Sequence, residues 1–100
     1  MIRGRNTDRF GNSWSEETII HAWVKGDVIQ RRRSYDWRRD ICGVYMKFSD
    51  HGEIHSIYGW EIDHIVPVVH GGSDDLSNLQ PLNWKTNAEK GDQLNWECPG

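Results

Sequence analysis

Apolar residues in the first quarter of the chain recur at the spacing of one helical face. Ser15 precedes them with a hydroxyl suited to a helix N-cap, and two glutamates follow it in the first turn. Gly26 is a natural end for such a helix. We therefore predict one helix of about ten residues. Its buried face is expected to hold Ile19, Ile20, Trp23 and Val24.

Further along, short alternating patterns predict strands. Residues 43–48 alternate as a half-buried strand does, with three apolar side chains on one face: Val44, Met46 and Phe48. A turn that contains glycine follows, and we expect residues 53–58 to return as a second strand. Residues 27–41 show no pattern that assigns them to a helix or a strand.

The last third of the chain combines short extended segments with one more helix. Residues 59–63 form a predicted strand that ends at His64, because Pro67 prevents a regular continuation. A glycine-containing loop and a second extended piece at 78–82 follow. Asn83 then suits the N-cap of a short helix that a glycine ends.

These elements indicate an α+β fold in one domain that spans residues 1–100, since no repeat or linker divides the chain. Residues 1–13 are polar and carry three arginines, so we expect a loose arm there. No stretch approaches the roughly 20 apolar residues of a membrane span. The N-terminus lacks the apolar run of a secretory signal, and two cysteines are too few for a disulfide framework. We therefore expect a cytoplasmic protein in which Cys42 is a small buried residue.

Charge is distributed unevenly, although the net charge is only −3. Residues 1–47 carry ten Lys or Arg and six acids, a net +4, whereas residues 48–100 carry two and nine, a net −7. The basic half includes a cluster interleaved with Tyr35 and Trp37, a composition typical of contacts to nucleic-acid phosphates. The residues predicted to make such contacts are Arg31, Arg32, Arg33, Arg38, Arg39 and, from the acidic half, Lys90.

The acidic half holds the residues suited to phosphodiester hydrolysis. Such chemistry needs a cation to neutralise the phosphate and a base to deprotonate water. Asp63 and Asn87 offer the oxygen atoms that Mg²⁺ prefers as ligands. Histidine is the side chain suited to proton transfer near neutral pH, which makes the adjacent His64 a candidate base.

Together these segments resemble a known family. Glu-Ile-Asp-His-Ile-x-Pro from residue 61, Gly-Gly at 71, Asn-Leu-Gln from 78 and Asn-x-x-Lys-Gly-Asp from 87 are similar to the HNH endonucleases of the ββα-metal (His-Me finger) class. The resemblance covers about residues 59–92 and implies a ββα-metal core behind an N-terminal helix. It implies that His64 activates water, that Asp63 and Asn87 bind one divalent cation, and that Asn78 holds the loop and orients His64.

Two departures from the family pattern matter. The third motif position is Asn87, so the chain resembles an HNN variant, and this harder ligand favours Mg²⁺, with Mn²⁺ as the second choice. Many relatives also carry two Cys-x-x-Cys pairs that bind a structural zinc. This chain has only Cys42 and Cys98, so we expect no structural zinc.

The sequence therefore predicts a metal-dependent HNH endonuclease that hydrolyses phosphodiester bonds in DNA. Double-stranded DNA is the favoured substrate, RNA is the second choice, and a monomer is the default. The alternative is a nucleic-acid-binding module with an HNH-like fold that does not cleave.

Overall fold

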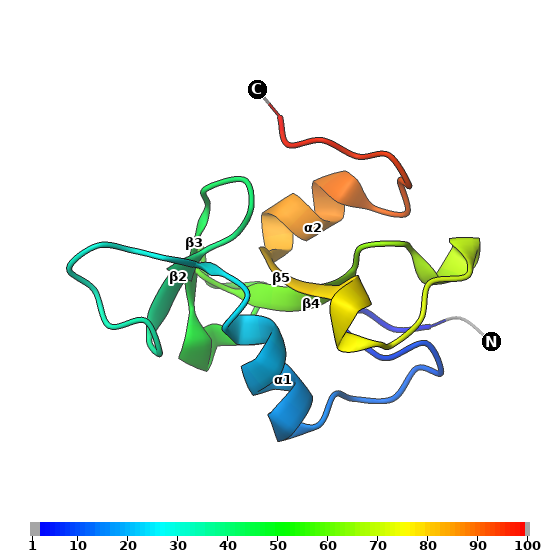
Figure 1. Cartoon of the computed structure of the whole chain (residues 1–100), viewed down its shortest axis with the longest axis horizontal. Helices are drawn as coiled ribbons and strands as arrows, with labels where there is room; N and C mark the ends of the chain where they lie inside the picture. The colour runs from blue at the N-terminus through cyan, green and yellow to red at the C-terminus, as the bar shows by residue number, and fades with distance from the viewer. Residues whose placement is uncertain (1–2, 100) are drawn as a thin grey trace.

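The computed structural model describes residues 3–99, which contain two α-helices and five strands (Figure 1). In chain order these are α1 (Glu16–Trp23), β1 (Asp27–Val28), β2 (Trp37–Arg39), β3 (Tyr45–Lys47), β4 (Trp60–His64), β5 (Leu79–Asn83) and α2 (Trp84–Lys90). The first three strands form one sheet in the order β1-β2-β3, and β4 pairs with β5 in a separate antiparallel hairpin. The predicted α+β class is confirmed.

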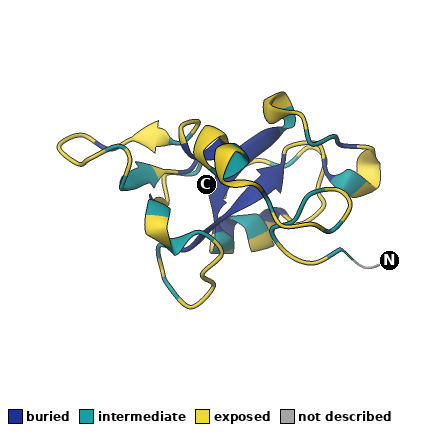
Figure 2. Ribbon diagram, turned by 90° about the horizontal axis from the view of Figure 1, so that it is seen from below, coloured by how far each residue is buried: buried dark blue, intermediate teal, exposed yellow. Residues whose placement is uncertain are grey.

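The hairpin of β4 and β5 lies between the two helices, with α1 on one face and α2 on the other (Figure 1). All ten hairpin residues are buried, as the dark blue ribbons show in Figure 2. Because successive strand residues point to opposite faces, Trp60 and Ile62 of β4 face α1, while Glu61 and Asp63 face α2. The polar side chains of β4 therefore share the face that α2 covers.

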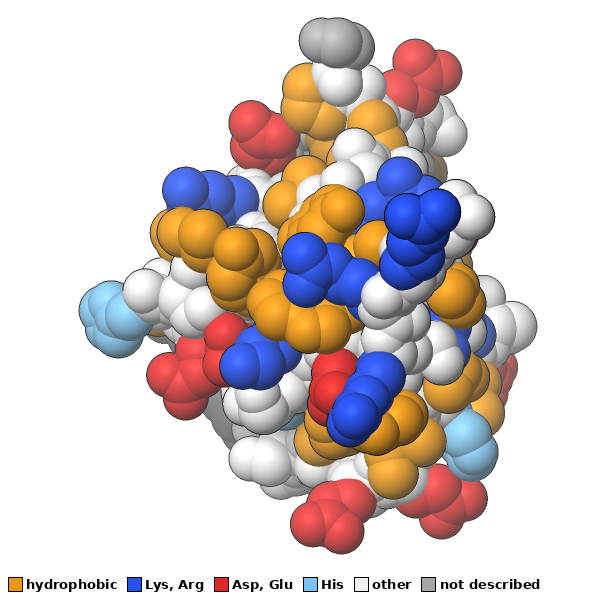
Figure 3. Space-filling model, turned by 90° about the vertical axis from the view of Figure 1, so that its left-hand side faces the viewer, with side chains coloured by type: hydrophobic (Ala, Val, Ile, Leu, Met, Phe, Trp, Pro, Cys, Tyr) orange, Lys and Arg blue, Asp and Glu red, His pale blue; other side chains and the backbone are white. Residues whose placement is uncertain are grey.

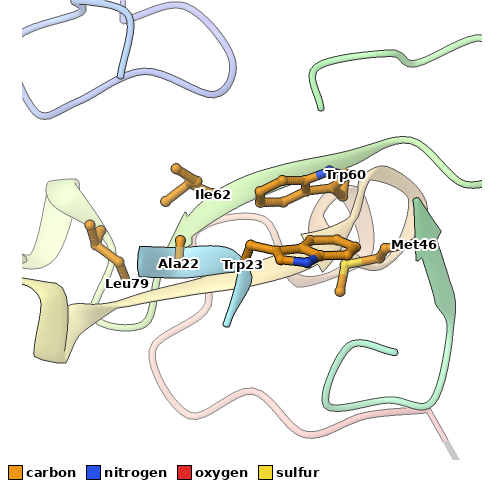
Figure 4. Close-up of a cluster of buried hydrophobic side chains, with 6 residues drawn as sticks. All are labelled: Ala22, Trp23, Met46, Trp60, Ile62 and Leu79. Carbon is orange, nitrogen blue, oxygen red and sulfur yellow. The ribbon is translucent and has the colours of Figure 1, made fainter. Parts of the chain in front are cut away.

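The apolar core fills the space between α1, β3 and the hairpin (Figure 4). The ring of Trp23 lies 5.0 Å from that of Trp60, and Met46 and Ile62 pack in the same cluster. An aromatic pair of this kind contributes about 0.5–1.5 kcal/mol beyond its buried area. The core thus fixes the start of β4, whose far end carries His64.

Helix α1 forms where the sequence predicted it, but its buried face is narrower than expected. Ser15 caps it by accepting a hydrogen bond from the Thr18 N–H, as predicted. The prediction that Ile20 and Val24 are buried is wrong, because their side chains are 51% and 53% exposed. Ala22 and Trp23 are the buried residues of the helix, and Ile19 is partly buried against the same core.

The predicted strand at 43–48 is confirmed as β3, but the predicted return strand at 53–58 is wrong, because these residues form turns. Their carbonyls accept from side chains and, at Tyr58, from the Lys47 N–H of β3, but no strand ladder forms. The Ser56 carbonyl accepts from Trp84 Nε1, and the Ile57 carbonyl accepts from Asn83 Nδ2. With its carbonyls satisfied in this way, the segment needs no strand partner.

The part of the predicted loose arm that the structure describes, residues 3–13, is held against the hairpin, and residues 1 and 2 lie outside the described residues. Asn6 Oδ1 accepts from the Ile62 N–H at 2.8 Å, and the Arg9 N–H donates to Asp74. The polar composition of this segment predicted a loosely ordered arm. The sequence could not show the hydrogen bonds that hold it, because they connect residues far apart in the chain.

Cys42 and Cys98 are joined in a disulfide that spans 56 residues, so the prediction of Cys42 as a free buried thiol is wrong. The bond ties the chain after α2 to the turn between β2 and β3. Cysteine usage therefore no longer supports the cytoplasmic expectation, which stays a prediction. Among the described residues, no helix has both the length and the apolar character needed to cross a membrane.

Candidate active site

A cavity of about 200 Å³ opens at the end of β4, between the N-terminal segment and α2. Asp63 and His64 reach it from the strand, and Asn87 reaches it from the helix. Strand β4 ends at His64, as predicted, so two successive side chains that leave opposite faces of the strand line one cavity. Three of the four residues expected to form the site are thus brought together.

His64 is 4% exposed and has a carboxylate partner. Its Nε2 lies 2.8 Å from Asp74 Oδ1. The ring centroids of Trp14 and His64 are 5.5 Å apart. A carboxylate can only accept a hydrogen bond, so this contact assigns the proton to Nε2. In the neutral imidazole the other ring nitrogen, Nδ1, is then an acceptor.

Asp63 is 6% exposed and accepts one hydrogen bond at each oxygen. Gln80 Nε2 donates to Oδ2 at 2.9 Å, and Lys90 Nζ donates to Oδ1 at 3.1 Å. Burial raises the pKa of Asp63, while the hydrogen bond from Gln80 and the Lys90 ammonium oppose that rise. Each carboxylate oxygen keeps a lone pair for a further ligand.

Asn87 is oriented by Glu61, a carboxylate that is 1% exposed. Asn87 Nδ2 donates to Glu61 Oε1 at 3.0 Å, so its Oδ1 is available to the cavity. Arg5 holds the same carboxylate with two hydrogen bonds, of 3.0 and 2.7 Å. This contact with Glu61 raises the pKa of Arg5. Glu61 thus connects the N-terminal segment to α2.

Asn78 does not line the cavity but joins the two ends of the loop that follows His64. Its Oδ1 accepts from the Val66 N–H at 2.8 Å, and its Nδ2 donates to the carbonyls of Val66 and Ser73. The Asn78 carbonyl also accepts from the Ile65 N–H. The two residues directly after His64 are therefore held by one asparagine.

The donor atoms at the cavity fit a hard divalent cation. Asp63 offers carboxylate oxygens and Asn87 an amide oxygen, which are ligands that Mg²⁺ and Mn²⁺ accept alongside water. Within residues 3–99, no three His, Cys, Asp or Glu side chains gather as a metal site.

Lys90 and Arg38, both predicted to contact nucleic acid, have cationic groups that serve the fold. Lys90 is 3% exposed, and its ammonium donates to Asp63 and to the His64 carbonyl. The Arg38 guanidinium donates to the carbonyls of Ser34, Val24 and Gly26. The Lys90 ammonium is too deeply buried to meet a phosphate, whereas Arg38 is half-buried and its contact with nucleic acid stays a prediction.

The other four predicted arginines are exposed at the end of the molecule opposite the cavity. Figure 3 shows blue Lys and Arg side chains beside orange apolar ones on the face formed by β2, β3 and the preceding loop. Arg32 lies over the rings of Trp37 and Tyr45, at 5.1 and 5.9 Å from their centroids, and Lys47 lies over Trp37. We call this set the cationic face: Arg31, Arg32, Arg33, Arg39, Lys47, Trp37 and Tyr45.

Sequence reasoning missed most partners of the site residues. Asp74 and Gln80 were not assigned a role, and Arg5 was placed on a loose arm. For Glu61 one local signal exists, because it precedes Asp63 by two residues on the same strand face. The contacts of Arg5 and Asp74 join residues 56 and 10 positions apart, and no spacing rule predicts them.

Comparison with known protein families gave one match. Residues 47–93 match the model described as HNH endonuclease, and the matched segment contains β4, β5, α2 and all the predicted site residues at the cavity. Searches of curated proteins and of solved structures gave no match.

Proposed function

Because residues 47–93 match the HNH endonuclease family, we propose that this protein is a metal-dependent endonuclease that hydrolyses phosphodiester bonds in DNA. The observation that carries the proposal is that Asp63, His64 and Asn87 line one cavity at the end of β4. A base and two hard oxygen ligands at one opening are what hydrolysis of a phosphodiester requires.

In this proposal His64 accepts a proton from water at Nδ1. The water oxygen bonds to phosphorus, the bond to the 3′ oxygen breaks, and that oxygen takes a proton from solvent water, so that a 5′ phosphate and a 3′ hydroxyl result. Lys90 and Gln80 hold Asp63, Glu61 holds Asn87, and Asn78 holds the backbone after His64. These contacts keep the reacting groups in place before the substrate arrives.

A divalent cation held by Asp63 and Asn87 would supply positive charge to the phosphate and to the leaving oxygen. An amide in place of an imidazole at position 87 makes the ligand set that of an HNN variant and favours Mg²⁺, with Mn²⁺ as a substitute. We propose one such ion per site.

In this proposal the cationic face binds the phosphates of the substrate. Its exposed guanidinium and ammonium groups can neutralise phosphates, and its aromatic rings order the cations above them. The face lies on the sheet of β1, β2 and β3, whereas the cavity lies at the end of β4 in the separate hairpin. A duplex long enough to span both is the substrate we favour.

Nicking of supercoiled plasmid tests the proposal. Wild-type protein should nick in Mg²⁺ or Mn²⁺ and not in EDTA, and His64→Ala should lose nicking while it keeps Mn²⁺ and DNA binding. His55→Ala removes an exposed histidine away from the cavity and should nick normally. DNA binding without nicking in any divalent metal would establish the alternative, a non-cleaving binding module.

The proposed grip has its own test. Arg32→Ala and Arg39→Ala should weaken binding to duplex DNA and each lower the slope of log affinity against log salt by about one contact. Lys85→Ala, which removes an exposed cation at the start of α2, is the matched control and should change little. Equal losses in all three variants would place the grip elsewhere, and tighter binding to RNA than to DNA would change the substrate class.

A further inference from the structure

We propose that Asp74, from the loop that precedes β5, is a positioning residue for His64. Its carboxylate keeps the proton of the imidazole on Nε2 and turns Nδ1 toward the cavity. This inference rests on the proposed function in that it assumes His64 to be the base, but its central claim is about the state of the ring and can be tested without cleavage.

The first observation is the contact itself. Asp74 Oδ1 lies 2.8 Å from His64 Nε2, and the His64 side chain is only 3% exposed. Among the described residues within hydrogen-bond distance of this ring, Asp74 is the one polar partner. A buried imidazole whose single polar contact is a carboxylate has one favoured tautomer, the one protonated at the contacting nitrogen.

The second observation is where the two residues lie. His64 lines the cavity and Asp74 does not, and from this we infer that the nitrogen bonded to Asp74 lies on the side of the ring away from the opening. The nitrogen on the other side of the ring is the one that a water in the cavity can reach. A ring turned the other way would present an N–H to the water and could not take its proton.

The third observation is that Asp74 is itself held in place from two sides. The Arg9 N–H lies 3.1 and 3.3 Å from its two oxygens. The turn that presents Arg9 is closed by Asp8, which accepts from the N–H groups of Phe10 and Asn12. On the other side, Asn78 holds the Ser73 carbonyl. The carboxylate is thus fixed before it meets the ring.

Through this arrangement the N-terminal segment helps to position the proposed base, His64. Residues 47–93 match the family model, whereas Arg9 lies outside them and fixes Asp74, which in turn fixes His64. The orientation of the base therefore depends on a part of this chain that the family motif does not contain.

The test compares Asp74→Ala with Asp75→Ala. Asp75 is the neighbouring exposed acid, and its side chain makes no cap contact, so its removal controls for charge and for loop sequence. We expect Asp74→Ala to lower kcat on the order of 100-fold, because a small misplacement of a reacting group has that effect, with KM nearly unchanged. Asp74→Asn should recover part of the loss, since an amide oxygen still accepts from Nε2–H. Asp75→Ala should match wild type.

The decisive readout is the nitrogen NMR spectrum of the His64 ring in the metal-free protein. Wild type should show a single tautomer with the proton on Nε2, and Asp74→Ala should show a mixture of the two. A wild-type ring protonated on Nδ1, or a tautomer and kcat unchanged in Asp74→Ala, would overturn the proposal. If Asp74→Ala fails to fold, the wild-type spectrum alone still decides. If wild type never cleaves while its ring shows the expected tautomer, the proposed function fails and the positioning contact stands.

Discussion

The amide side chains around the site are oriented by their neighbours, residue by residue. Asn6 is an example: its Oδ1 accepts from the Ile62 N–H, so its Nδ2 must face His51 Nε2 at 2.9 Å. That nitrogen therefore has to accept a hydrogen bond, which only a neutral imidazole can do. The attachment of the N-terminal segment to β4 thus depends on the protonation state of one histidine.

The free energy of unfolding of the protein should decrease as the pH is lowered, because His51 becomes protonated. Burial lowers the pKa of His51, although the charge of Glu61 opposes the shift. The unfolded chain, with a histidine pKa of about 6.5, therefore takes up the proton first. The stabilising effect of a neutral His51 is complete above that pH and is lost as the pH falls toward the lower pKa of the folded state.

Urea unfolding between pH 5 and pH 8 measures this effect. His51→Gln keeps an acceptor for Asn6 and does not titrate, so the difference in unfolding free energy between it and wild type should change only below about pH 6.5. His55→Gln, at an exposed histidine, should keep the wild-type profile. A parallel pH dependence in His51→Gln and wild type would show that another group is responsible.

Glu61 is the second residue whose partners define its task, because it receives both Arg5 and Asn87. Glu61→Gln replaces one carboxylate oxygen with an NH₂ group, which would then face the donor groups of Arg5 or Asn87. We expect Asn87 to lose its fixed orientation and Mn²⁺ affinity to fall about 10- to 100-fold, the usual effect of a lost ligand partner. Glu89→Gln, on the exposed side of α2, is the control. Isothermal titration with Mn²⁺ decides, and equal affinities would remove Glu61 from this role.

At the scale of elements, the position of His64 is set by where β4 ends and how the next loop begins. The start of β4 is fixed by the core through Trp60, and its end is fixed by Asn78, which bonds to the backbone of Ile65 and Val66. Gly72 allows the loop to close, because a side chain there would collide with the Val66 carbonyl. The strand and loop together deliver the histidine to the cavity.

Asn78→Asp tests this loop with almost no change in volume. The substitution removes the amide donor to two carbonyls and places a carboxylate oxygen against them. We expect a loss of about 2–3 kcal/mol in unfolding free energy together with a fall in kcat, measured by urea unfolding and plasmid nicking. Ser77→Ala, at the exposed neighbouring residue, should retain both. Full activity in Asn78→Asp would mean that the loop does not position His64.

Elements with a local signal were predictable from the sequence, and those built by distant partners were not. The caps of α1 and α2 and the alternation in β3 follow from neighbouring residues. Strands β1 and β2 are two and three residues long and lie within residues 27–41, where the sequence shows no alternating pattern. The site divides in the same way, since Asp63 and His64 are adjacent, whereas Asp74 and Arg5 reach their partners only in the folded chain.

At the scale of the whole molecule, the two halves of opposite charge share the work of the site. The acidic half supplies Asp63, His64 and Asn87, but the basic half supplies Arg3 and Arg5 to the same cavity and the cationic face at the other end. Basic residues near the proposed metal site would attract a phosphate into a region whose acidic residues would otherwise repel it. A net charge of −3 is therefore compatible with a nucleic-acid substrate.

The disulfide between Cys42 and Cys98 is the covalent link across this whole structure, and its reduction should lower stability without changing the site. Closing a segment of 56 residues restricts the unfolded chain and is worth up to about 4 kcal/mol. Urea unfolding with and without reductant should show a loss of that order, while Mn²⁺ affinity stays the same because neither cysteine lines the cavity. The double variant Cys42→Ser, Cys98→Ser should have the unfolding free energy of reduced wild type, and reductant should not change it. Two free thiols in the protein purified without reductant, together with unfolding that reductant does not affect, would contradict this prediction.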